Sequence, residues 1–141
     1  MSTWSSQDLD RIGAADELRI APRPPDGTPE RWTPIWVVRV GDDLYVRSWR
    51  GKRGAWYQNA LSTHSGRIRA GGVERDVTLT DAGDATDTPH EDIDRGYRTK
   101  YARYDPTYVE PMTAGAARAA TLRLDPAELT TSAEASVEEP D

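Results

Sequence analysis

WTPIWVVRVGDDLYVRSWRGKRGAWYQNAL, the stretch from Thr33 to Asn59 with its immediate neighbours, is the part of the sequence around which the chain is organised. It contains a β-branched run at Val37–Val40 and a return run at Leu44–Val46, both typical of strands. The residues between these runs, Gly41-Asp42-Asp43, have the chemistry of a tight turn. This part of the sequence therefore predicts a β-hairpin.

A glycine-bounded basic loop, SWRGKRG at Ser48–Gly54, follows the hairpin and precedes a predicted short helix at Ala55–Leu61. Loops between a strand end and a helix start often bind anions, because helix N–H groups and positive charges converge there. This loop does not carry the GxxxxGK[ST] signature of phosphate-binding loops. It is therefore a candidate anion cradle on residue type and position alone.

Composition favours a single domain. The chain has 141 residues and no cysteine or phenylalanine, so five tryptophans and six tyrosines supply its aromatic core. No apolar run approaches the roughly 20 residues of a membrane helix, and the N-terminus does not resemble a signal peptide. We expect one domain at residues 1–129, an acidic disordered tail at 130–141, and a cytoplasmic protein that does not bind membranes.

Charge is distributed unevenly along the chain. The net charge is −6, yet Arg39 to Arg75 carries +5 and the remainder −11. A basic centre in an acidic protein suits a small phosphorylated ligand better than a nucleic acid, which the acidic remainder would repel. The alternative is that these arginines simply alternate outward on solvated strands.

Further strand and helix signals flank this stretch. Strands are predicted at Glu17–Ala21, Arg67–Ala70, Val73–Leu79 and Ala120–Leu124, and helices begin after Ser5 and within Met112–Ala120. The glycine pair Gly71-Gly72 between two of these strands suits a second hairpin. The run of hairpin-linked strands predicts an α+β (mainly β) fold. In it, five or six mostly antiparallel strands form a small barrel with flanking helices.

The clearest helix is predicted from Pro89 to Tyr104. Thr88-Pro89-His90-Glu91 has the form of a capping box. An apolar stripe lies behind it and consists of Ile93, Tyr97, Tyr101 and Tyr104. Stripes of this spacing mark the buried face of a helix, so we expect this one to pack against the barrel.

Side chains for acid–base or nucleophilic catalysis are scarce. The two histidines, His64 and His90, have no zinc-ligand spacing and are most simply structural. No nucleophile motif is present, and the carboxylates of Asp84–Asp94 match no cation-binding loop. Catalytic residues are therefore unknown from sequence, no metal site is predicted, and any enzyme activity would rely on a cofactor.

The sequence resembles the deazaflavin-dependent nitroreductases of the FMN-binding split-barrel superfamily. The resemblance rests on TPIWVV from Thr33, GDDLYV from Gly41 and AWYQNAL from Ala55. The closest likeness is to a small uncharacterised bacterial family that shares IRAGGVERDV from Ile68 and RYDPTYVEPM from Arg103. This resemblance covers most of the chain from Trp4 to Asp125 and implies a split β-barrel.

The same resemblance implies a cofactor site for FMN or a deazaflavin. Its expected residues are Arg47, Ser48, Trp49, Arg50, Gly51, Lys52, Ala55, Trp56 and Asn59. The basic residues would hold phosphate, and Trp49 and Trp56 would flank the ring. The deazaflavin enzymes carry a GRKSG loop where this chain has Pro22 to Arg31, a difference that favours FMN over a long-tailed deazaflavin.

Two functions follow from this reading. The first is a flavin- or deazaflavin-dependent oxidoreductase acting on a small organic substrate. The second is a non-catalytic split-barrel protein that binds another anionic small molecule, its tryptophans serving only as core. A split barrel with exposed sheet edges commonly dimerises, so a homodimer remains an open alternative.

Overall fold

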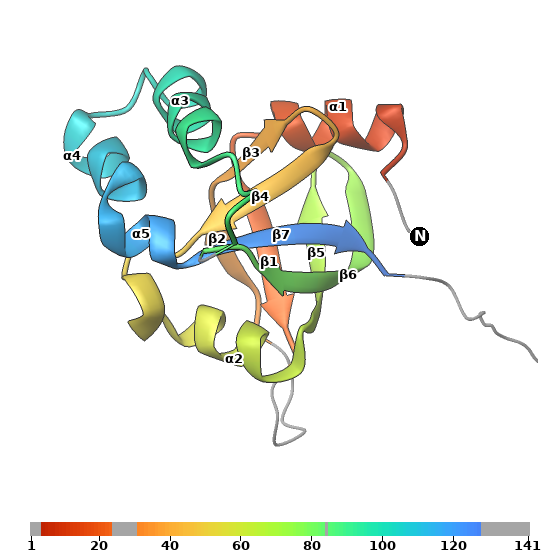
Figure 1. Cartoon of the computed structure of the whole chain (residues 1–141). Helices are drawn as coiled ribbons and strands as arrows, with labels where there is room; N and C mark the ends of the chain where they lie inside the picture. Colours follow the sequence, from red (N-terminus) through yellow and green to blue (C-terminus); the bar gives the residue numbers. More distant parts are fainter. Residues whose placement is uncertain (1–3, 24–30, 84, 128–141) are drawn as a thin grey trace, which may run out of the picture.

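Seven antiparallel strands wrap into one nearly closed sheet, in the order β2-β1-β5-β6-β7-β4-β3 (Figure 1). The computed structural model describes residues 4–23, 31–83 and 85–127. Its strands are β1 (Leu18–Pro22), β2 (Thr33–Ile35), β3 (Val37–Val40), β4 (Asp43–Arg47), β5 (Ser65–Ala70), β6 (Val73–Asp81) and β7 (Thr121–Pro126). The predicted barrel is confirmed. It has seven strands instead of five or six, because residues 33–35 pair separately with β1.

The barrel is split between its two edge strands, β2 and β3, which are consecutive in sequence and separated only by Trp36. At this seam the backbone N–H and carbonyl of Val37 form hydrogen bonds with side chains. Its N–H donates to the Tyr101 hydroxyl (3.2 Å), and its carbonyl accepts from Lys100 Nζ (2.7 Å). Side chains therefore replace ladder hydrogen bonds where the sheet does not close.

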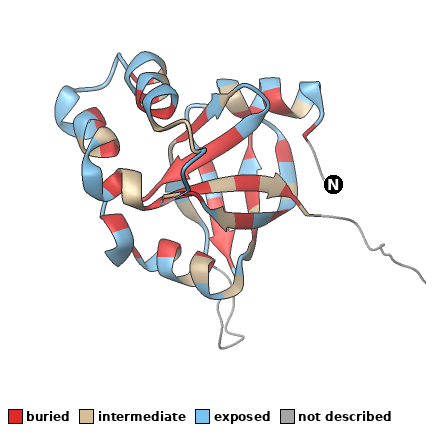
Figure 2. Ribbon diagram, in the orientation of Figure 1, coloured by how far each residue is buried: buried red, intermediate tan, exposed pale blue. Residues whose placement is uncertain are grey.

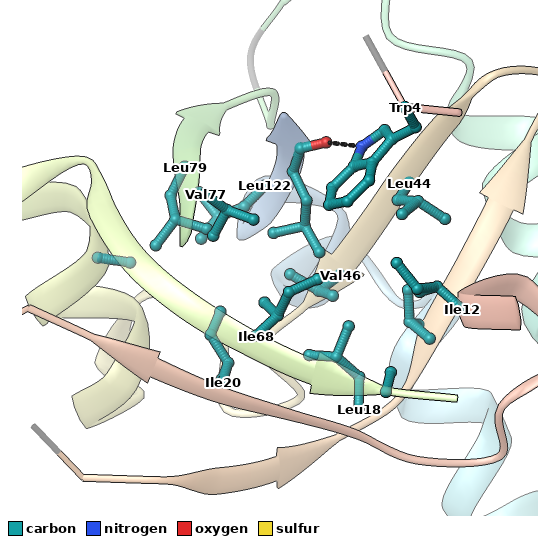
Figure 3. Close-up of a cluster of buried hydrophobic side chains, with 14 of the residues drawn as sticks. Trp4, Ile12, Leu18, Ile20, Leu44, Val46, Ile68, Val77, Leu79 and Leu122 are labelled. Atoms are coloured by element: carbon teal, nitrogen blue, oxygen red, sulfur yellow. Dashed lines mark hydrogen bonds between the residues drawn. The ribbon is translucent and has the colours of Figure 1, made fainter. Parts of the chain in front are cut away.

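Strand β7 is the last of the described strands in sequence but lies between β6 and β4 in the sheet. Its Leu122 and Leu124 belong to the buried barrel core. Figure 3 shows Leu122 in this core with side chains from β1, β4, β5 and β6. The indole N–H of Trp4 donates to the Leu124 carbonyl (2.9 Å) and ties the N-terminal segment to this central strand.

Both predicted hairpins are confirmed. Strands β3 and β4 pair through a turn at Gly41, whose φ is +62°. Strands β5 and β6 pair through Gly71 and Gly72, with φ of +57° and +82°. Positive φ is accessible to glycine without steric cost, which explains the residue at each turn.

Two helices cover the ends of the barrel (Figures 1 and 2). Helix α1 (Ser6–Ala14) begins at the predicted cap Ser5, whose hydroxyl accepts from the Asp8 N–H (3.1 Å). It buries Leu9 and Ile12. Helix α2 (Ala55–Thr63) lies at the opposite end and buries Tyr57 and Ala60. The interior is apolar and closed at both ends.

A layer of helices covers the side of the barrel next to β3. It consists of α3 (His90–Lys100), α4 (Pro106–Val109), the 3₁₀ turn η2 (Glu110–Thr113) and α5 (Gly115–Ala119). Of the predicted stripe, Ile93, Tyr97 and Tyr101 are wholly buried, whereas Tyr104 lies beyond the helix end and is 37% exposed.

The predicted capping box at the start of α3 is wrong. The Thr88 hydroxyl donates to the Ala82 carbonyl (2.6 Å) instead of capping the helix, and Pro89 occupies the N-cap position without a side-chain bond. The Thr88 hydroxyl bonds to the Ala82 carbonyl because the loop after β6 passes close to it. The local sequence does not show that this carbonyl competes with the helix N–H groups for the hydroxyl.

Several expectations fall on residues outside the described ranges. They concern the tail at 130–141 and most of the loop from Pro22 to Arg31. Within the described part of the chain, no helix is long and apolar enough to cross a membrane.

Candidate functional site

A cleft of about 500 Å³ lies where the barrel seam, the loop after β4 and the helical layer meet. The seam contributes one wall, the loop and the start of α2 a second, and α4 with η2 a third. The lining residues are Pro34, Ile35, Trp36, Arg47, Trp49, Trp56, Thr107, Tyr108, Pro111 and Met112. This volume is in the range of small-molecule sites, and the walls are largely apolar and aromatic.

The three tryptophans of the cleft differ in how firmly they are held. Trp36 stacks on Tyr101 with ring centroids 4.0 Å apart and planes inclined by 5°. Trp56 is half-buried against the barrel core, edge-on to Tyr57. Trp49 is 62% exposed, with the Arg50 guanidinium over its ring at 5.3 Å. The cleft thus has two fixed aromatic walls and one solvent-facing aromatic at its mouth.

Arg47 forms the floor of the cleft and is wholly buried. Its Nε–H donates to Thr121 Oγ1 (3.0 Å), and Nη1 donates to Asp94 Oδ1 (2.5 Å) and the Met112 carbonyl (2.8 Å). Nη2 donates to His90 Nδ1 (3.0 Å) and makes a long contact with the His90 carbonyl (3.5 Å). An arginine has five N–H donors, so none is left for a ligand phosphate.

The partners of Arg47 are themselves fixed. The other oxygen of Asp94, Oδ2, accepts two hydrogen bonds from Arg118, one from Nε and one from Nη2. Burial would raise the pKa of the Asp94 carboxyl, but hydrogen bonds and charge from Arg118 and Arg47 lower it below its ordinary value. His90 accepts at Nδ1, so its Nε2 carries the proton that is donated to the Gly83 carbonyl (3.1 Å).

The basic loop forms a tight turn at the mouth of the cleft. Gly51 adopts φ +66° at the start of the 3₁₀ turn η1 (Gly51–Arg53). A Cβ on Gly54 would lie 2.4 Å from Ser48 Oγ, so a larger residue there would require the buried Ser48 side chain to move. Gly54 is the N-cap of α2 and has no side chain to cap the helix, and the first turn of α2 contains no acidic residue. The helix start therefore keeps N–H groups available for an anion.

The nine predicted cofactor residues gather in this region but in different roles. Arg47, Trp49 and Trp56 line the cleft, and Arg50, Lys52 and Ala55 are exposed at the turn beside it. Ser48 and Gly51 are buried beneath the turn, and Asn59 lies one turn further along α2 without lining the cleft. Their binding of a cofactor stays a prediction.

Seven lining residues were not among those predicted. They come from the seam and from the helical layer: Pro34, Ile35, Trp36, Thr107, Tyr108, Pro111 and Met112. All seven belong to the segments TPIWVV and RYDPTYVEPM, on which the family resemblance rests. That shared pattern is the signal in the sequence that marks these positions.

The cleft offers little acid–base chemistry. Among the described residues that line it there is no carboxylate, histidine or lysine. The described residues also contain no group of three or more His, Cys, Asp or Glu placed to hold a metal ion. The arrangement suits stacking of a planar ring rather than hydrolysis by paired side chains.

Comparison with known proteins places this fold. A family model described as "Uncharacterized protein conserved in bacteria (DUF2255)" matches residues 8–124. No curated protein matches the chain. The crystal structure of conserved hypothetical protein Rv2991 from Mycobacterium tuberculosis is similar, with a TM-score of 0.52 and 13% identity over 87% of this chain and 79% of that one. A structure described as an F420 reductase gives a TM-score of 0.53 and 12% identity, over 85% and 93%. At such low identities, these TM-scores show a shared fold and nothing more.

Proposed function

The chain belongs to DUF2255, a family of uncharacterized proteins conserved in bacteria, and from that premise we propose that its cleft binds a flavin or deazaflavin. In this proposal the loaded protein is an oxidoreductase that acts on a small organic substrate. The observation that carries it is the seam cleft of about 500 Å³ with three tryptophans in its walls. The F420 reductase of the same fold supports the choice of cofactor class.

The walls fit a planar heteroaromatic ring. Trp36 is held flat by its stack on Tyr101, so its cleft-facing side is a pre-formed platform. Trp56 is held by the core on the other side. Rigid aromatic walls bind flat rings with little loss of side-chain entropy and also exclude water.

The phosphate would lie at the mouth of the cleft and not at its floor, because the donors of Arg47 are all engaged. Arg50 and Arg53 are exposed on the turn beside the uncapped start of α2. Guanidinium groups and helix N–H groups together are a common cradle for phosphate. Arg47 then acts indirectly, by fixing the Met112 backbone in the cleft wall.

A bound flavin or deazaflavin supplies hydride transfer, which needs no protein nucleophile. That requirement agrees with the residues present, since Tyr108 and Thr107 are the only hydroxyl side chains that line the cleft in the described chain. The protein's part in this proposal is to bind the ring, orient it and keep water from its buried face.

Tryptophan fluorescence tests the proposal. FMN should quench the emission on binding, because three tryptophans line the cleft, and the affinity should fall as salt screens charges over about 10 Å at 0.1 M. Arg50→Glu should weaken FMN binding ten-fold or more, about 1.4 kcal/mol. Arg69→Glu is the matched control, because Arg69 also covers an exposed tryptophan, Trp32, at 4.5 Å but lies outside the cleft.

Riboflavin separates ring binding from phosphate binding. It should bind more weakly than FMN and be indifferent to Arg50→Glu. Equal affinity for FMN and riboflavin would reject the phosphate cradle. No quenching by FMN, riboflavin or a reduced deazaflavin would reject the cofactor proposal and favour a binder of another anionic small molecule.

A further inference from the structure

A second, smaller pocket of about 290 Å³ lies at the other end of strand β4 from the cleft. Arg47 ends β4 at the cleft, whereas Asp43 begins it at this pocket. The pocket is bordered by the end of β6, by β7 and by the loop that leads into α3. Its lining residues are Val40, Asp43, Tyr45, Thr80, Asp81, Ala82, Ala85, Asp87, Thr88, Pro89 and Arg123.

Tyr45 is a buried polar side chain that faces this pocket. The residue as a whole is only 5% exposed, and its hydroxyl has no hydrogen-bond partner among the described residues. Burial raises the pKa of that hydroxyl, Asp43 and Asp87 raise it further and Arg123 lowers it. The hydroxyl therefore lies among the charged groups of the pocket. The hydroxyl is not one of the fully buried unpartnered atoms of the described chain, so it reaches the solvent of the pocket and can donate to or accept from a ligand there.

The pocket is negatively charged. Asp43, Asp81 and Asp87 line it, against the single cation Arg123. Arg123 is itself paired, through Nε, with Asp125 Oδ2 at 3.0 Å. One oxygen of Asp81 accepts from the Gly83 N–H, while Asp43 and Asp87 make no ion pair within the described residues. A pocket with this balance attracts cations.

We propose that this pocket is a binding site for a small organic cation with a primary ammonium group. An ammonium presents three N–H donors, which match the carboxylates of Asp43 and Asp87 and the hydroxyl of Tyr45. A bare metal ion fits less well, because the described residues hold no cluster with metal-binding geometry and Arg123 would repel it. The volume is at the lower limit of ligand pockets, so the amine is a small aliphatic one.

Nuclear magnetic resonance titration with butylammonium chloride tests this site. At constant ionic strength it should shift the backbone amide signals of Asp43, Tyr45 and Asp87 in a saturable way. Butanol and sodium butyrate, which match its size without its charge, should not. Flavin binding at the cleft should be unaffected, so this test is independent of the function proposed above.

Matched variants identify the groups that bind. Tyr45→Phe should weaken butylammonium binding about three- to ten-fold, the loss expected of one hydrogen bond, without lowering stability. Tyr97→Phe removes a buried hydroxyl outside the pocket and should change nothing. Asp87→Asn should weaken binding by a similar factor, whereas Asp92→Asn, in an exposed pair with Arg95, should not.

Three results would overturn the proposal. The first is the absence of saturable shifts at butylammonium concentrations up to about 100 mM, at which even a very weak site would be occupied. The second is an equal response to butanol, which would mark apolar contact. The third is binding of butyrate, which would make the pocket an anion site at Arg123.

Discussion

Replacement of Asp94 by alanine tests how the helical layer is held to the barrel. The carboxylate has a side-chain exposure of 6% and pairs with Arg47, whose side chain is fully buried. Removing one partner of such a pair leaves an uncompensated buried charge and typically costs about 3–5 kcal/mol. Domains of this kind have a total stability of about 5–15 kcal/mol, so the variant should be strongly destabilised.

The magnitude depends on Arg47 rather than on Arg118. The Arg118 side chain is 40% exposed, so its pair with Asp94 is screened by solvent and should be worth under about 1 kcal/mol. Arg118→Ala is therefore expected to be mild. Asp92→Ala is the matched control in the same helix, because Asp92 forms only an exposed pair with Arg95 and should cost about 0.3–0.5 kcal/mol.

Urea unfolding followed by tryptophan emission measures these differences at neutral pH. In acid the advantage of wild type over Asp94→Asn should shrink. The folded carboxyl has a pKa below its ordinary value of 3.8, so the unfolded chain binds more protons as pH falls through this region and stability is lost. A loss below about 1 kcal/mol for Asp94→Ala, or one no greater than that of Asp92→Ala, would refute the reasoning.

Three further outcomes are expected. The pKa of Lys100 is lowered to about 8, chiefly by burial, so the unfolded chain binds more protons between about pH 8 and 10. Stability should rise over that window and do so less in Lys100→Met, as pH-dependent urea unfolding would show; an unchanged slope would contradict this. Gly71→Ala should cost about 1–3 kcal/mol more than Gly72→Ala, because a Cβ on Gly71 would lie 2.3 Å from the Arg11 carbonyl oxygen whereas Gly72 has open space. Equal losses would argue against that contact. Truncation after Thr130 should shift the melting temperature by less than about 4 °C, because the removed residues include only one large apolar side chain; a larger fall would show that they pack on the domain.

The strands and turns could be predicted from sequence because their signals are local. The β-branched run at Val37–Val40 and the glycines at 41 and 71–72 mark the hairpins without any knowledge of distant residues. The stripe of α3 was equally visible, since Ile93, Tyr97 and Tyr101 follow helical spacing. Periodicity determines which face is buried, and the structure agrees with it.

The roles of the site residues could not be predicted in the same way. In the sequence Arg47 belongs to a basic segment, and nothing near it indicates that Asp94 and Met112 will engage its donors. The local sequence likewise does not indicate that Trp36 will line a site, because its stack on Tyr101 forms only in the folded seam. Such contacts join residues far apart in the chain, so they depend on the closed fold and not on local pattern. The oligomeric state stays a prediction.

Strand β7 is the last of the described strands to leave the ribosome, yet it lies between β6 and β4 inside the sheet. Until its residues 121–126 emerge, β4 and β6 both have an unpaired edge, and such edges invite pairing with other chains. The missing pairs also join distant parts of the sequence, which slows their formation. The nascent protein therefore cannot complete its barrel until β7 has emerged, and its risk of aggregation is greatest before that point.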